Sequence, residues 1–216
     1  MTDALALATA LQVGDSQFPS GGIAFSWGLE TLSREGGIDR DRIGAFLEAQ
    51  LHGRWAGFDR VVVAAAHAAD LDGRAALDET VEAMSWSASL RDGSRRAGQA
   101  MLSAHARLGT PTVDDARRHL PHGHLPVVQG VVSAGLGLDR TAALTLSGTT
   151  FLNGLASAAV RLGLAGALAI QGDLARLRPA IAELATEEPP PQPTSFAPMA
   201  DIAMARHAPA GALLAN

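Results

Sequence analysis

The sequence contains no cysteine and no tyrosine, and only 4% of its residues are aromatic. Without cysteine the chain cannot form a disulfide, a thiolate metal site or a cysteine nucleophile. Its 216 residues are still enough to bury a substantial core without cross-links. We therefore expect one domain of ordinary size whose stability does not depend on disulfides.

Charged residues are scarce as well. They make up 18% of the chain, against about 25% in typical soluble domains. This is too little charge to cover a lone surface, so we expect another polypeptide to cover part of it. The net charge of -5 and the pI of about 5.8 provide no basic surface for nucleic acid.

One uncharged run extends from Thr141 to Val160, and its length allows a membrane-spanning alternative. Its content of Thr, Ser, Gly and Asn, with Arg140 and Arg161 at its flanks, favours instead a central helix of a bundle. The first residues show no basic segment ahead of an apolar core. No signal peptide is expected, and the predicted location is the cytoplasm.

Alanine, leucine and arginine dominate the sequence, which predicts helix almost throughout. No stretch with a two-residue period indicates a sheet. The apolar spacing predicts helices at 9–13, 22–34, 39–51, 59–73, 75–86, 88–108, 125–138, 141–162 and 167–185. Asp139 is expected to cap the start of one helix and Gly163 to end it. The predicted fold is all-α, a compact bundle of about eight to ten helices within residues 1–185.

Residues 186–216 are expected to form a separate linker and tail. The prolines of "TEEPPPQPTSFAP" forbid helix and predict an extended, solvated tether. The following "MADIAMARHAPAGALLAN" carries Met199, Ile202 and Met204. These side chains bury little alone, but they can dock on another subunit as a short helix.

The stretch "DSQFPSGGIAFSWGLETL" places a turn directly before an apolar run. Pro19 fixes φ, and Gly21 and Gly22 permit positive φ. Neither a P-loop nor a dinucleotide-binding pattern surrounds these glycines. We interpret them as a turn that lets two buried helices approach closely, with a ligand loop as the alternative.

Three histidines, His119, His122 and His124, lie in "HLPHGHLP". Because imidazole is a common metal ligand, an alternative function is a helical small-ligand or metal-binding protein, or an enzyme, that uses this loop. The spacing matches no defined metal motif, and the neighbouring prolines indicate a solvated loop. No catalytic constellation is recognisable, so we predict no catalytic residue, cofactor site or resident metal.

A further helix, "LRDGSRRAGQAMLSAHARLG", carries Arg91, Ser94, Arg95 and Gly98. These residues form either a solvated face, with the arginine stems covering apolar neighbours, or an arginine-lined face for an acidic partner. The sequence leaves both interpretations open.

Five blocks, taken in order, resemble the UreF family of urease accessory proteins. "DSQFPSGGIAFSWGLE" resembles the N-terminal signature, "LRDGSRRAGQAML" the Arg-Ser-Gly helix and "HLPVVQGVVSAGLGL" the His-x-Pro-Val-x-x-Gly block. "LASAAVRLGLAG" is similar to the Ser-Ala-x-x-Arg-Leu-Gly block, and "FAPMADIAMARH" to the C-terminal Pro-x-x-x-Ile-x-x-x-Arg-His. The blocks run from residue 11 to residue 207, and their shared order makes the resemblance specific.

The resemblance implies an all-helical dimer without an established catalytic activity of its own. It implies a scaffold that helps assemble the urease active site, where two nickel ions are held on a carbamylated lysine. The implied partners are UreD (UreH in some organisms), the nickel-carrying GTPase UreG and apo-urease. Nickel would be handled by the complex, and the GTP cycle of UreG would be coupled to its delivery. No nucleic acid or membrane partner is expected.

The residues that match the family motifs are the expected partner-binding or structural positions: Ser20, Gly21, Gly22, Gly28, Leu29, Glu30, Arg161, Leu162, Gly163, Pro198, Arg206 and His207. Glu30 either lines a polar path for nickel or pairs with Arg34 one turn on. The ending "APAGALLAN" lacks the acidic residue and the arginine with which family tails usually continue. In addition, Gly166-Ala167-Leu168 replaces the family's Gly-Gln. These departures predict weakened or altered partner binding, or a divergent paralogue.

Overall fold

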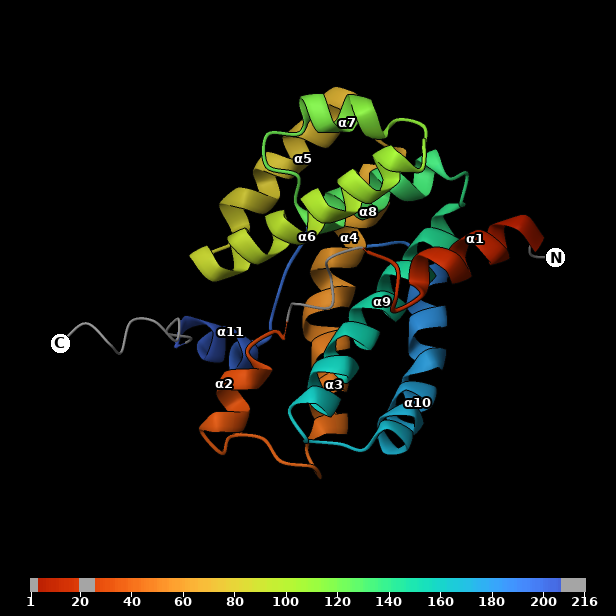
Figure 1. Cartoon of the computed structure of the whole chain (residues 1–216). Helices are drawn as coiled ribbons and strands as arrows, with labels where there is room; N and C mark the ends of the chain where they lie inside the picture. The colour runs from red at the N-terminus through yellow and green to blue at the C-terminus, as the bar shows by residue number, and fades with distance from the viewer. Residues whose placement is uncertain (1–3, 20–25, 207–216) are drawn as a thin grey trace.

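The computed structural model describes residues 4–19 and 26–206, and within these ranges it contains helices and no strand (Figure 1). The all-α prediction is therefore confirmed. The elements are α1 (Ala4–Gly14), α2 (Leu29–Arg34), α3 (Ile43–Gln50), η2 (Leu51–Asp59), α4 (Arg60–Ala68), α5 (Leu71–Met84), α6 (Ala88–Arg107), α7 (Val113–His119), α8 (Leu125–Gly135), α9 (Arg140–Arg161), α10 (Ala167–Thr186) and α11 (Pro198–Ala205).

Helix α9 crosses the middle of the molecule between two groups of helices (Figure 1). Helices α5 to α8 lie at one end, and α2, α3, α10 and α11 lie at the other. Each group has its own apolar core. One core contains Leu47, Trp55 and Leu152, and the other contains Phe58 and Val131. Since Trp55 and Phe58 both belong to η2, this element lies where the two cores meet.

Helices α3 and α4 are joined without a break through η2, which is a π-helix. The amide of Arg60 donates to the carbonyl of Trp55, five residues back, as a π-helix requires. The sequence predicted a new helix at 59–73. Helix α4 does follow Asp59, but without a break from η2, and it ends at Ala68 rather than at Gly73. The break falls instead at Asp70, whose Oδ1 accepts from the amide of Gly73 (2.9 Å) and caps α5.

Two further boundaries differ from the predictions. Helix α2 begins at Leu29 and not near residue 22, because Trp27 (φ 48°) and Gly28 (φ 77°) adopt left-handed backbone conformations that no α-helix accepts. Helix α7 was not predicted. Its acidic first turn and basic last turn complement the helix dipole, a signal that could have revealed it.

The predicted caps of α9 are confirmed. Asp139 Oδ1 accepts from the amide of Ala142 (2.7 Å), and Gly163 follows the helix with φ 71°. The uncharged run of α9 packs between α1, α4, α8 and α10. Among the helices of residues 4–19 and 26–206, none combines the length and hydropathy that a membrane span needs.

The chain between α10 and α11, residues 187–197, contains no helix and is largely exposed. It is also bonded to the bundle, because the amides of Thr194 and Phe196 donate to the carbonyls of Gly57 (2.8 Å) and Gly53 (2.7 Å). Helix α11 then packs on α2 and α6 of the same chain.

Candidate functional site

The N-terminal and C-terminal motifs meet in the structure. A Cβ at Gly28 would lie 2.8 Å from Cβ of Ala203, so only glycine allows α11 to pack this closely on the start of α2. Leu29 is fully buried next to this contact. Arg206, at the end of α11, donates to Glu35 after α2 (3.3 Å). Pro198 occupies the first position of α11, where its missing amide hydrogen is not needed.

Four of the motif residues, Ser20, Gly21, Gly22 and His207, lie outside the described residues, so the proposed glycine turn is not tested. Glu30 is exposed in the first turn of α2, where the helix dipole favours a carboxylate. It does not line the cavity described below.

The Ser-Ala-x-x-Arg-Leu-Gly motif lies at the end of α9, away from the contact between α2 and α11. Arg161 is at the end of α9, where its guanidinium donates to Ser157 Oγ (3.1 Å), and Gly163 ends the helix. Arg161 borders a broad groove between α1, α9 and α10. Most of this groove is lined by Ala, Leu, Thr and other uncharged side chains.

A buried ion pair, which the sequence analysis did not identify, lies next to the α2–α11 contact. Arg54 Nε and Nη2 each donate to a carboxylate oxygen of Asp59 at 3.1 Å. The guanidinium also stacks on the rings of Trp27 (4.9 Å) and Phe58 (3.9 Å). Burial raises the pKa of Asp59, and the charge and hydrogen bonds of Arg54 oppose that rise.

The α11 helix brings a second carboxylate towards the same guanidinium. Burial raises the pKa of Asp201, while the charge of Arg54 and a hydrogen bond from Trp86 act to lower it. Arg54 is therefore influenced by one carboxylate within η2 and by another on the C-terminal helix.

Arg54 and Asp59 line a cavity of about 130 Å³ between the two cores. Trp27 forms part of its wall, together with Gln129 and Ser147. The indole of Trp55 donates to Ser147 Oγ (3.2 Å), which in turn donates to Gln129 Oε1 (3.1 Å). The left-handed backbone of Trp27 is unusual for a bulky residue, and such strain is found preferentially at functional positions. The cavity is thus polar along one side, and a residue of unusual backbone conformation forms part of its wall.

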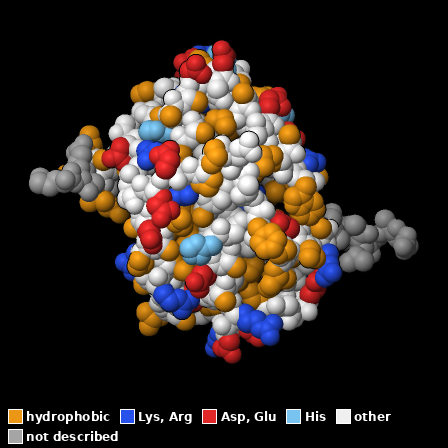
Figure 2. Space-filling view, turned by 180° about the vertical axis from the view of Figure 1, so that it is seen from behind, with side chains coloured by type: hydrophobic (Ala, Val, Ile, Leu, Met, Phe, Trp, Pro, Cys, Tyr) orange, Lys and Arg blue, Asp and Glu red, His pale blue; other side chains and the backbone are white. Residues whose placement is uncertain are grey.

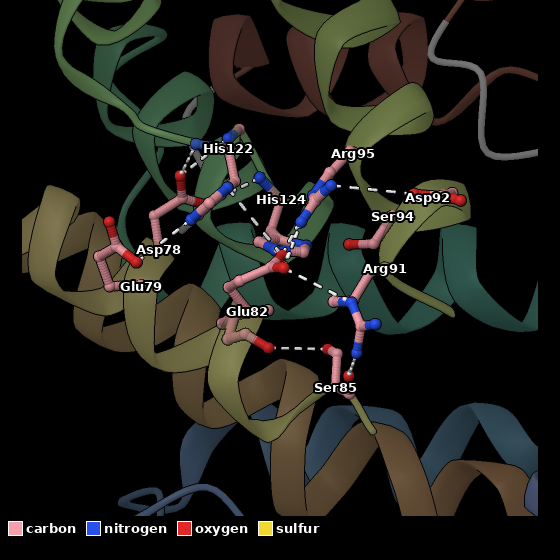
Figure 3. Close-up of polar contacts among 12 residues, drawn as sticks. Asp78, Glu79, Glu82, Ser85, Arg91, Asp92, Ser94, Arg95, His122 and His124 are labelled. Atoms are coloured by element: carbon pink, nitrogen blue, oxygen red, sulfur yellow. Dashed lines mark hydrogen bonds and ion pairs between the residues drawn. The ribbon is translucent and has the colours of Figure 1, made fainter. Parts of the chain in front are cut away.

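The histidine loop is held by a network of charges on α5 and α6 (Figure 3). Asp78 accepts hydrogen bonds from the amides of His122 (2.7 Å), Gly123 (2.8 Å) and His124 (2.8 Å). The His124 ring is fully buried, and its Nε2 lies 2.8 Å from Glu82 Oε2. Burial lowers the pKa of His124, although the nearby carboxylates oppose this.

Glu82 is the centre of this network. Burial acts to raise its pKa, but hydrogen bonds from Arg95 and His124 outweigh burial and hold the pKa below its ordinary value. Arg91 approaches the same carboxylate at 3.5 Å, and Ser94 Oγ accepts from the amide of Leu125 (3.1 Å). The arginine face of α6 therefore braces the histidine loop.

The three histidines of the alternative metal hypothesis do not come together. His119 lies on α7, exposed, with Nδ1 2.8 Å from the carbonyl of Asp115. His122 and His124 are neighbours, with ring centroids 5.7 Å apart, and His122 Nε2 lies 3.2 Å from Glu79. Across the described ranges, no group of three or more His, Asp or Glu side chains is arranged to hold a metal ion.

Comparison with known proteins decides the family. The UreF family model matches residues 38–178, the region from just before α3 to a point within α10. A urease accessory protein UreF of Trichodesmium erythraeum (strain IMS101) is 32% identical over 217 residues, covering 91% of this chain and 90% of that protein. The chain belongs to the UreF family. A UreF of Cereibacter sphaeroides (strain ATCC 17025) is also 32% identical, over 94% of both chains.

The resemblance seen in the sequence is thus confirmed. Because the alignments with these UreF relatives cover at least nine-tenths of the chain, they reach beyond the core that the family model matches. The sequence motifs included Gly28 and Arg206, which lie at the contact between the start of α2 and α11. They did not mark Arg54 and Asp59, which are five residues apart and would not face each other on an α-helix.

Proposed function

We propose that this chain is a non-enzymatic scaffold in the assembly of the urease nickel centre. Its relatives over nearly the full length are named urease accessory proteins, and this observation carries the proposal. The chain would bridge UreD (UreH) and the GTPase UreG and present them to apo-urease in the cytoplasm. Nickel is cargo of that complex, and this chain binds no cofactor of its own.

An apolar surface around α11 supports a partner at the C-terminal end. Phe196 is 80% exposed and Ile202 is 52% exposed, with Met199 one turn away from Ile202. Trp86, which bonds to Asp201 of α11, adds an exposed indole. Figure 2 shows hydrophobic side chains gathered on this side of the molecule. We call Trp86, Phe196, Met199 and Ile202 the α11 surface and assign it to UreD.

A second apolar surface, on α1, supports a second copy of the chain. Val13 is the one buried residue of this helix, whereas Leu5, Leu7 and Leu11 are exposed. An isolated helix of this length is marginal in water, so a covering partner would stabilise it. The helix has no charged residue and borders the largely uncharged groove over α9. In a symmetric dimer, α1 of each copy can therefore cover the groove of the other copy.

We also propose that this chain modulates the GTP cycle of UreG. A scaffold that contacts UreG in only one of its nucleotide states shifts the population of that state by its differential affinity. This chain would thereby couple nucleotide exchange or hydrolysis to nickel delivery without contributing a catalytic residue.

Co-expression with UreD and UreG tests the proposal. We expect affinity-tagged protein to retain both partners, and we expect the native mass of the complex to contain two copies of this chain. Folded UreD and UreG that both fail to co-purify with it would contradict the scaffold function. A complex that contains one copy would contradict the dimer alone.

A further inference from the structure

We call the C-terminal segment Thr194–Arg206 the clasp. The first residues of the clasp lie against the backbone of η2. A Cβ at Gly53 would lie 2.3 Å from the carbonyl oxygen of Phe196, and one at Gly57 would lie 2.7 Å from that of Thr194. The two amides of the clasp bond to the carbonyls of the same glycines. The clasp thus runs antiparallel to η2 along its glycine face, with backbone against backbone.

The buried ion pair depends on the π-helical register of η2. In an α-helix, residues five apart are separated by about 140° around the axis and cannot pair. In a π-helix the backbone bonds link residues five apart, so Arg54 and Asp59 lie one above the other. Arg60 Nε supports the same register by donating to the carbonyl of Ala56 (3.0 Å). Long π-helical runs are rare, and this one therefore needs contacts from outside the helix.

The other end of the clasp reaches Arg54 by a second route. Ala203 packs on Gly28. Trp27, the residue that precedes Gly28, has its ring over the Arg54 guanidinium. Asp201, on the same helix as Ala203, acts on that guanidinium by its charge. Both ends of the clasp therefore act on one buried group in the cavity wall.

The clasp also buries few large side chains. Its buried residues are Ala197, Ala200, Ala203 and Met204, three of which are alanines. The burial of alanine removes little apolar area from water. An eight-residue helix is not stable alone, so α11 loses its helical structure when it leaves the bundle.

We propose that the clasp is a conformational latch that holds η2 in its π-helical register. With the clasp docked, Arg54 stays paired with Asp59 and Trp27 stays in the cavity wall. With the clasp undocked, η2 loses its outside contacts, the pair loosens and the cavity widens. This inference goes beyond the scaffold function and applies to the isolated chain, whatever protein contacts the C-terminal end.

Hydrogen exchange on the full-length chain tests the latch. Ala203→Glu places a carboxylate at the contact with Gly28 and should undock α11, while the amino-acid sequence of η2 stays unchanged. We expect amide exchange in residues 51–59 to rise by about tenfold or more, while α8 keeps its protection. Ile202→Glu is the matched control, because this exposed neighbour on the same helix does not touch α2 through Gly28. It should leave residues 51–59 unchanged.

A second variant acts at the other end of the clasp. Phe196→Pro removes the amide that donates to Gly53 and should also raise exchange in residues 51–59. Rapid exchange in α11 with unchanged exchange in residues 51–59, in either variant, would overturn the latch. A clasp that stays protected in both variants would also overturn it, because its docking would then not depend on these contacts.

Discussion

A few charged side chains are buried in this protein, and those described below form hydrogen bonds with other groups of the chain. Asp59 receives two hydrogen bonds from Arg54, Asp78 receives three from backbone amides, and Arg74 Nε donates to the carbonyl of Ala66 (3.0 Å). Burial of a charge is costly unless such partners replace water. These residues therefore fix the relative positions of helices rather than provide reactive groups.

His105 is a buried titratable residue whose effect on stability has a definite sign. Its Nδ1 lies 2.9 Å from Thr110 Oγ1, and burial lowers its pKa below the usual 6.5. Below about pH 6.5 the unfolded chain therefore binds a proton at His105 that the folded chain does not bind. The free energy of unfolding should fall as the pH falls through this window, by at most about 1.4 kcal/mol per pH unit for one proton.

Urea denaturation of wild type and His105→Gln at pH 7.0 and 5.5 measures this contribution. We expect the variant to lose less stability than wild type between the two pH values. Some loss should remain, since burial also lowers the pKa of His124. An equal loss in both proteins would show that His105 does not stay neutral in the folded state.

At the scale of elements, the contact of α6 with the histidine loop depends on Gly98. A Cβ at this position would lie 2.0 Å from the carbonyl oxygen of Gly123. Gly98→Ala should therefore destabilise the fold by about 1–3 kcal/mol through overpacking. Gly172→Ala is the matched control, because this exposed glycine of α10 has no neighbour within 4 Å.

The control should be neutral or stabilising by about 0.5–1 kcal/mol, since alanine is the better helix former. Thermal unfolding of the two variants compares these effects directly. Equal midpoints for Gly98→Ala and wild type would mean that α6 and the loop separate without cost.

The sequence predicted the helical fold and the caps of α9, because composition and capping act locally. It did not predict η2, since the π-helical register depends on the clasp and on α2, which are distant in sequence. Asp59 was expected to start a helix, yet it pairs with Arg54 within a continuous one. The family motifs located Gly28 and Arg206, whereas the contact between their elements required the three-dimensional structure.

The histidine loop shows the same limit. The sequence grouped His119 with His122 and His124 by proximity, but α7 carries His119 away from the other two. Glu79 and Glu82, which face the remaining pair, come from a helix more than 35 residues earlier in the chain. Spacing within a loop could not reveal carboxylates that only packing brings near.

At the scale of the whole molecule, the described residues expose apolar side chains on α1 and on the α11 surface. Low charge and exposed Leu, Met, Phe and Trp are typical of a protein that works with other chains covering it. The proposed function assigns the surface on α1 to a second copy and the α11 surface to UreD. We therefore propose that the chain functions through the surfaces that it presents.

Binding of UreD to the α11 surface tests this claim most directly. The variant is Met199→Glu/Ile202→Glu, and the control is Leu108→Glu, an exposed leucine at the end of α6. Titration calorimetry with purified UreD should show binding by wild type and control, and about tenfold or greater loss of affinity in the double variant. The thermal midpoint of the double variant should stay unchanged. Equal affinity of all three proteins for UreD, or no binding by wild type, would contradict the account.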